Sequence, residues 1–275
     1  MTLPHVLSIA KYVLRRGVLR IRLGYGKPVI EPKEFIRGNS RGDILRNSII
    51  VFSRFTAKTI KKYLERIEDI KLDIPSIESY TGFYRGKRLA VVRVCFGAPA
   101  TIMALELMIA HGLKRAIVIG YAGAINPKLR ITDILLPTWG IREEGTSHHY
   151  YPPEHVPRSS RAITDRLYEN IKKIKGRKKF RVLKGGIWTI DAIFRETRDK
   201  VIEYSRRGIL GVDMESTALM CVAEYRNIEL AIMLTITDEL YRDKWVSIYD
   251  DKKLLRRAMK NERLLIKAVL ETITA

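Results

Sequence analysis

The chain has 275 residues, of which 46% are hydrophobic, and its 51 Lys and Arg against 30 Asp and Glu give a net charge of +21. This length and apolar content indicate one large domain or two small ones with a sizeable core. The chain has only two cysteines, Cys95 and Cys221, and no apolar run long enough to span a bilayer. These features exclude a disulfide scaffold and an integral membrane protein, and they favour the cytoplasm.

The excess of positive charge favours anionic ligands, and a polyanion such as nucleic acid has to be considered. Lys and Arg gather in residues 172–184, which contain no acid. Most charged runs are simply solvated surface, so nucleic-acid binding is the lesser alternative.

The predicted elements follow a basic N-terminal extension, residues 1–47, which we expect to pack on or near the core. The predicted strands cover residues 48–52, 80–84, 89–96, 115–121, 134–139, 185–189, 209–212 and 230–237. The predicted helices cover residues 56–67, 98–111, 159–174, 196–206, 214–226 and 250–273. This alternation predicts an α/β layered domain with a mainly buried sheet over residues 48–275.

Four short stretches combine glycines and acids at the end of a predicted strand or the start of a predicted helix. They are FGAP (96–99), IGYAGAI (119–125), GVDMES (211–216) and TITDEL (235–240). Ligands of open α/β sheets gather where strands end, and glycine lets the backbone approach a ligand closely. We therefore expect these four stretches to surround one binding site.

These stretches, together with YTGFYRGKRLAVVRV (80–94) and REEGTSHHYYPP (142–153), resemble the nucleoside phosphorylase-I family from about Tyr80 to Leu240. The resemblance implies a single-domain, three-layer α/β fold with a bent mixed central sheet flanked by helices. It implies cleavage of the N-glycosidic bond of a nucleoside by phosphate, which yields the free base and ribose 1-phosphate. It also implies a homo-oligomer, usually a dimer-built hexamer, that uses phosphate as co-substrate and needs no metal or organic cofactor.

For the sugar, the resemblance assigns Glu215 to the ribose hydroxyls and Met214 to packing against the ring. A carboxylate can accept hydrogen bonds from two adjacent hydroxyls at once, and such charge-assisted bonds are strong. The alternative for Glu215 is an acid stabilised at a helix N-terminus by the helix dipole. His5 resembles a histidine that reaches the 5′-hydroxyl of a neighbouring subunit's substrate.

For the base, Asp238 is the expected catalytic residue, because a carboxyl group near a purine can stabilise the departing base. The expected base-binding residues are Tyr121, Ala122, Gly123, Phe194, Val212 and Asp213. TITDEL favours a purine, whereas REEGTSHHYYPP resembles the uridine phosphorylase branch. Residues 191–198 contain no clear Gln/Arg pair of the kind that holds uracil in that branch.

The phosphate site departs from the family pattern, because Val118 stands where an arginine is usual. The residues that could bind phosphate instead are Ser53, Arg54, Arg93 and Gly97. Two alternatives to a phosphorylase therefore stay open. One is a nucleosidase, in which Glu215 or Glu239 activates water; the other is a non-catalytic relative that binds nucleosides or RNA.

Overall fold

The computed structural model describes residues 26–36, 42–72 and 76–275, and these form one α/β domain with a single mixed sheet. His5 lies outside the described residues. The strands are β1 (Asn47–Val51), β2 (Glu65–Asp69), β3 (Ser76–Tyr84), β4 (Lys87–Val94), β5 (Arg115–Ala124), β6 (Ile134–Glu143), β7 (Val182–Ile190), β8 (Ile209–Asp213), β9 (Glu229–Glu239) and β10 (Val246–Ser247). The α-helices are α2 (Arg54–Lys61), α3 (Ala98–Ala110), α4 (Arg161–Lys175), α5 (Arg198–Arg206), α6 (Ser216–Tyr225) and α7 (Lys252–Ile273). Short 3-10 helices, among them η1 (Pro32–Phe35), η4 (Ile193–Arg195) and η5 (Ile248–Asp250), occupy several connections.

The sheet is strongly bent. Its strand order is β10-β9-β6-β7-β8-β5-β1-β4-β3-β2, and β9 also pairs with β5, so the five strands from β9 to β5 close into a ring. Parallel pairs such as β1–β5, β5–β9 and β6–β7 stand beside antiparallel pairs such as β6–β9 and β5–β8. The expected bent mixed sheet is thus confirmed.

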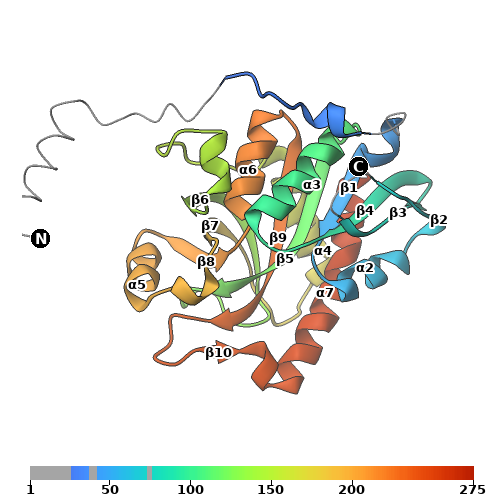
Figure 1. Ribbon diagram of the computed structural model, residues 1–275. Coiled ribbons are helices and arrows are strands. Elements are labelled where there is room, and N and C mark those ends of the chain that lie inside the picture. The colour runs from blue at the N-terminus through green and yellow to red at the C-terminus, as the bar shows by residue number, and fades with distance from the viewer. Residues whose placement is uncertain (1–25, 37–41, 73–75) are drawn as a thin grey trace, which may run out of the picture.

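Helices cover both faces of this sheet and produce three layers (Figure 1). Alternation along β5 divides its side chains between the two faces, as in any strand. Ala116 and Val118 lie in the apolar cluster formed with α3 and α6, whereas Ile117 and Ile119 lie in the cluster formed with α2, α4 and α7. The burial of β5 on both faces explains why its sequence is almost continuously apolar.

The prediction of one helix over residues 56–67 is wrong in its second half. Helix α2 ends at Lys61, and residues 65–69 form the edge strand β2, which pairs with β3. The apolar residues Ile60, Leu64 and Ile67 suit a helical period, but Leu64 instead packs against Gly82 of β3. Tertiary packing therefore overrides the local pattern here.

Several strands run further than the sequence predicts, and these extensions shape the site. Strand β5 continues to Ala124 and β9 to Glu239, so the IGYAGAI and TITDEL stretches, except for the last residue of each, lie within paired strands. No helix in the described part of the chain is long and apolar enough to cross a membrane.

Candidate active site

A cavity of about 170 Å³ lies where six strands end, and we call it the site cavity. Its lining comes from the ends of β5, β8 and β9 and from the loops after β1, β4 and β7. The lining residues are Phe52, Phe96, Tyr121, Ala122, Gly123, Ile193, Glu196, Val212, Asp213, Met214, Glu215, Thr237 and Asp238. All four chemistry-bearing stretches contribute to it, as expected from their positions at strand ends.

The sugar-binding candidates Met214 and Glu215 lie in the turn between β8 and α6 and face the cavity. Glu215 is only 8% exposed, and its Oε1 accepts a hydrogen bond of 2.6 Å from the Gly97 amide. Gly97 has φ of 90°, a conformation that strongly favours glycine. Burial raises the pKa of Glu215, and the nearby charge of Asp213 raises it further. One carboxyl oxygen is thus held by the protein, while the group as a whole faces the cavity.

Asp213 lines the same cavity, but its carboxylate is engaged by the protein. Its Oδ1 accepts a hydrogen bond of 2.7 Å from the Thr189 hydroxyl, and its Oδ2 accepts one of 3.0 Å from the Ser216 amide. Burial raises the pKa of Asp213, and these hydrogen bonds oppose that effect. Asp213 therefore fixes the start of α6 and the turn that carries Glu215.

Asp238, the expected catalytic residue, enters the cavity from β9. Its Oδ1 accepts a hydrogen bond of 3.0 Å from the Thr237 hydroxyl, and its Oδ2 accepts one of 2.9 Å from the Trp245 indole. These two bonds fix the orientation of the Asp238 carboxyl group in the cavity. Glu215 and Asp238 thus come from separate strand ends and share one cavity.

The end of β5 approaches Asp238 closely. A Cβ added at Gly123 would lie 3.0 Å from Asp238 Oδ2 and 2.4 Å from Leu240 Cδ1, so a larger residue does not fit without movement. The neighbouring Tyr121 directs its hydroxyl away to the buried Glu262 of α7, at 3.2 Å. Burial raises the pKa of Tyr121 to about 12, so this hydroxyl keeps its proton.

Glu196 is a cavity residue that the sequence reasoning missed. It lies after η4 and lines the site cavity together with Asp238. Burial raises the pKa of Glu196 to about 8, and the charges of Asp238 and Asp213 contribute. A perturbed acid inside a cleft is a signal of function, but it arises only when the chain is folded. The only sequence signal for Glu196 is its place in the stretch 191–198, which corresponds to the segment where the uridine phosphorylase branch has its base-binding pair and this chain shows no clear one.

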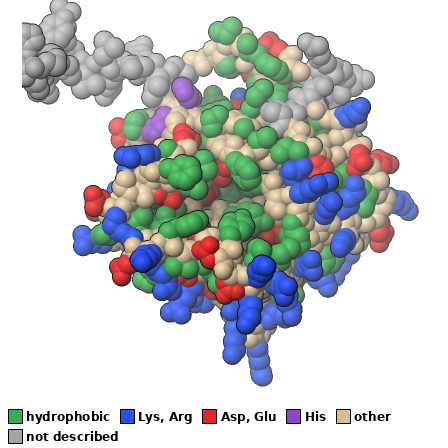
Figure 2. Space-filling model, turned by 60° about the horizontal axis from the view of Figure 1, so that its bottom comes forward, with side chains coloured by type: hydrophobic (Ala, Val, Ile, Leu, Met, Phe, Trp, Pro, Cys, Tyr) green, Lys and Arg blue, Asp and Glu red, His purple; other side chains and the backbone are tan. Residues whose placement is uncertain are grey.

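A second hollow of about 430 Å³ adjoins the site cavity, since Ile193, Glu196 and Asp238 line both. Phe194, expected to pack on the base, lines this outer hollow and not the site cavity, and it is 96% exposed. Trp245, also in the outer hollow, is 64% exposed. Figure 2 shows a face of the molecule on which hydrophobic side chains gather around a hollow, with Lys and Arg along the lower edge.

The phosphate-binding candidates do not converge on the site cavity. Arg93 pairs with Glu78 on β3, with 3.3 Å between Nε and Oε2. Ser53 caps α2, its hydroxyl accepting from the Phe55 amide at 3.1 Å, and Arg54 is exposed on that helix. Among the described residues that line the site cavity there is no Lys or Arg.

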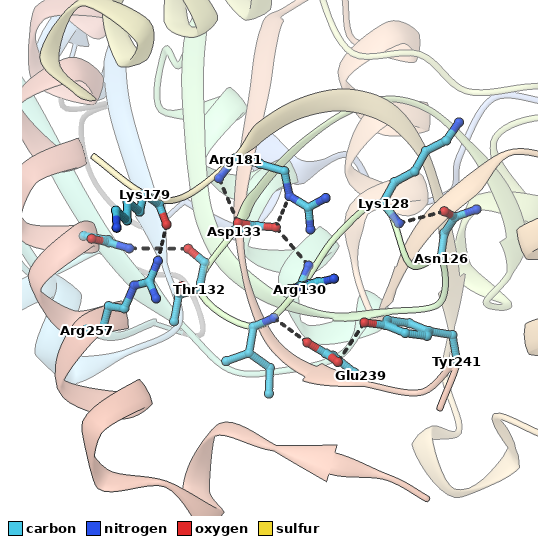
Figure 3. A network of polar contacts seen from close by, with 12 residues as sticks. Asn126, Lys128, Arg130, Thr132, Asp133, Lys179, Arg181, Glu239, Tyr241 and Arg257 are labelled. Atoms are coloured by element: carbon cyan, nitrogen blue, oxygen red, sulfur yellow. Dashed lines mark hydrogen bonds and ion pairs between the residues drawn. The ribbon is translucent and has the colours of Figure 1, made fainter. Parts of the chain in front are cut away.

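Glu239, the other acid proposed to activate water in a nucleosidase, does not line the site cavity. Its Oε1 accepts a hydrogen bond of 3.0 Å from the Ile131 amide, and the Tyr241 hydroxyl donates to Oε2 at 2.8 Å (Figure 3). Arg242 donates to the same carboxylate. Glu239 therefore links the end of β9 to the loop before β6 and stabilises the strand end on which the preceding residue, Asp238, lies.

No group of three or more His, Cys, Asp or Glu in the described ranges could hold a metal ion. His155, which follows His148 and His149 in the connection between β6 and α4, contacts Glu224 of α6 at 2.6 Å and stacks on Tyr151.

The sequence profile of the phosphorylase superfamily matches residues 48–271, and the chain belongs to this family. A DeoD-type purine nucleoside phosphorylase of Caldanaerobacter subterraneus is 24% identical over 227 residues, which cover 81% of this chain and 95% of that protein. A DeoD-type enzyme of Clostridium novyi is 28% identical over 61% of this chain and 71% of its own length.

Solved structures show the same fold. Uridine phosphorylase from Vibrio fischeri superposes with a TM-score of 0.74 at 20% identity, over 90% of this chain and 99% of that chain. Purine nucleoside phosphorylase from Toxoplasma gondii, solved with immucillin-H, gives 0.73 at 19% identity, over 90% and 98% of the two chains.

Proposed function

We propose that this protein is a nucleoside phosphorylase that cleaves the N-glycosidic bond of a nucleoside, with a preference for purines. The observation that carries this proposal is the placement of Glu215 and Asp238 on the lining of one cavity, from separate strand ends. Membership of the phosphorylase superfamily and the similarity to DeoD-type enzymes support it.

Glu215 binds the two ribose hydroxyls, and Met214 packs against the sugar. The Gly97 amide holds one oxygen of Glu215 and so fixes the orientation of the carboxyl group. As a carboxylate, Glu215 can accept from both hydroxyls and stabilise the positive charge that develops on the sugar as the bond breaks; burial and Asp213 raise its pKa to about 8, so this form gains population as the pH rises toward that value.

Asp238 and Glu196 act on the base, which lies between Gly123, Val212 and these two acids. The Thr237 and Trp245 donors hold the Asp238 carboxyl group in place, and burial together with the nearby Asp238 and Asp213 raises the pKa of Glu196 to about 8. A protonated acid that lines the same cavity as a second carboxyl group is suited to a leaving group that gains negative charge at a purine nitrogen. His5 reaching the 5′-hydroxyl of a neighbouring subunit's substrate remains part of this proposal.

Hydrolysis by water is the second candidate reaction, and one observation favours it. A phosphate dianion needs several converging donors, yet the described lining of the site cavity contains no Lys or Arg. In the phosphorylase proposal, Ser53 and Arg54 must supply those donors, because Arg93 is already paired with Glu78 and the Gly97 amide already donates to Glu215.

Release of free base from inosine, adenosine and uridine, measured with and without phosphate, tests the proposal. Release that requires phosphate, and is faster for the purines, supports it; release without phosphate identifies a nucleosidase. No release in either condition contradicts both and leaves a non-catalytic nucleoside- or RNA-binding protein.

Asp238→Asn tests the leaving-group role within that assay. The amide keeps the shape and the contact with Trp245 but cannot exchange a proton, so turnover should fall about 100-fold or more. Asp199→Asn, an exposed carboxyl on α5, is the matched control and should leave turnover unchanged. Equal turnover of Asp238→Asn and the wild type would remove Asp238 from the mechanism.

We also propose a homo-oligomer, with the hexamer as the expected assembly. A hollow between residues 26–35, α3 and α6 exposes apolar side chains, among them Met103 (49%) and Tyr225 (46%). Light scattering should give a mass several times the 31.7 kDa of one chain, and a monomer mass would contradict this. Free Cys95 and Cys221 suit a reducing cytoplasm.

A further inference from the structure

A strongly basic cavity of about 640 Å³ lies apart from the site cavity and shares no lining residue with it. We call it the basic pocket. Its lining includes six cationic side chains, Arg130, Lys175, Lys178, Lys179, Arg181 and Arg257. Only one acid, Asp133, lines it.

Three separate segments bring these cations together. Arg130 lies in the loop before β6, Arg257 lies on α7, and the other four lie between the end of α4 and the start of β7. The guanidinium of Arg257 donates to the Lys179 carbonyl and so links α7 to the α4–β7 connection (Figure 3). The clustering is therefore a property of the fold and not of one charged run.

Asp133 holds the backbone of two pocket residues, Arg130 and Arg181, in place. It accepts hydrogen bonds from the Arg181 amide and Nε, both 2.8 Å, and from the Arg130 amide at 2.9 Å (Figure 3). Asp133 is 5% exposed, and these contacts use both of its oxygens. It fixes the backbone on which two of the arginines stand, and it neutralises only Arg181.

The other five cations have no carboxylate within 4.0 Å among the described residues. Like charges held close together repel and raise the free energy of the fold unless an anion joins them. A concave surface also focuses their field, which raises the local concentration of anions. The pocket is thus built for a ligand with several negative charges.

We propose that the basic pocket binds a compact polyphosphate group, the chemistry shared by inorganic triphosphate and a nucleoside triphosphate. Arginine forks bind phosphate oxygens in pairs, and lysines add charge at the rim. The one aromatic residue in the lining, Phe180, is 3% exposed and offers no face on which a base could stack. Single-stranded RNA, which is held largely by stacking on aromatic side chains, is therefore disfavoured.

Calorimetric titration of the full-length protein with inorganic triphosphate, ATP and orthophosphate at fixed ionic strength tests this. We expect both triphosphates to bind more tightly than orthophosphate. Lys178→Gln/Lys179→Gln should weaken triphosphate binding about tenfold or more, since each charge-assisted contact is worth about that factor. Arg130→Gln should weaken it as well.

Lys172→Gln/Lys173→Gln is the matched control, because it removes the same charge from the same basic run but lies outside the basic pocket. It should bind triphosphate like the wild type. Nucleoside cleavage should stay unchanged in all of these variants. Equal weakening in the control, binding of ATP but not of inorganic triphosphate, or tighter binding of a single-stranded RNA would each overturn the proposal.

Discussion

Replacing Glu196 by Gln tests whether the site cavity keeps a carboxyl group in its protonated form. Burial raises the pKa of Glu196 from an ordinary 4.5 to about 8, and the charges of Asp238 and Asp213 add to this effect. The amide of Gln has nearly the same shape as the protonated acid but does not titrate. The variant therefore removes the ionisation and little else.

The sign of the effect follows from the proton balance. Between pH 4.5 and about 8 the folded protein holds a proton on Glu196 that the unfolded chain has released. Stability therefore falls as pH rises through this window and levels off above it. At about 1.36 kcal/mol per pH unit the upper bound is about 5 kcal/mol. Glu196 is only partly buried, so solvent screening reduces this to about 1–2 kcal/mol.

Urea unfolding at pH 5, 7 and 9 measures this difference. Glu196→Gln and the wild type should be about equally stable at pH 5, and the variant should be more stable by about 1–2 kcal/mol at pH 9. Glu203→Gln on the exposed side of α5 is the matched control and should follow the wild type at every pH. If the wild type and Glu196→Gln lose stability in parallel from pH 5 to 9, the cavity does not hold a protonated Glu196.

Three further changes probe the other contacts in the site cavity. Glu215→Gln places an amide group against a ribose hydroxyl, so KM for ribonucleosides should rise about tenfold while KM for 2′-deoxynucleosides rises less; equal changes for both would argue against diol binding. Trp245→Phe removes the indole donor to Asp238, and we expect kcat to fall about tenfold with little change in KM, as steady-state kinetics would show. Gly123→Ala introduces a Cβ only 3.0 Å from Asp238 Oδ2 and should cost about 1–3 kcal/mol of stability and most of the activity. Gly145→Ala, where the nearest atom is 3.7 Å away, is its control in thermal unfolding and should melt like the wild type.

The parts of the site that the sequence predicts are those carried by short, contiguous stretches. The turn that holds Glu215 and the strand end that holds Asp238 each combine an apolar run with an acid, and this pattern is visible without coordinates. Strand ends meet at one edge of a sheet, so their convergence in one cavity follows from the fold class. The layered fold itself follows from the alternation of strands and helices.

The remaining features depend on contacts between distant parts of the chain. Strand β2 forms only because β3 offers it a pairing edge, and its own residues also fit a helix. The pKa of Glu196 is raised first by burial and then by Asp238 and Asp213, which lie 42 and 17 positions away in the sequence. The basic pocket joins three segments, and only one of them is a dense run of charge. Neither hydrophobic periodicity nor local propensity predicts such contacts between distant segments.

The position of Asp238 depends on an irregularity in the pairing of β9 with β5, which interrupts the regular alternation of side chains along β9. Along β9, Ile232, Leu234 and Ile236 face one apolar cluster and Met233 faces the other, as alternation requires. The pairing with β5 then shifts, because Ala122 stands opposite Ile236 but Gly123 stands opposite Asp238.

Thr237 is the extra residue at this shift, and such bulges re-aim side chains at the ends of strands. The bulge sets Asp238 opposite Gly123, which leaves room for the carboxylate. Any side chain at position 123 would meet the Asp238 carboxylate. The Asp238 carboxylate can therefore occupy its position only if residue 123 is a glycine, although the two residues lie 115 positions apart in the sequence. Without this shift, Thr237 would stand opposite Gly123 and Asp238 opposite Ala124, so the bulge is what brings the acid to the glycine.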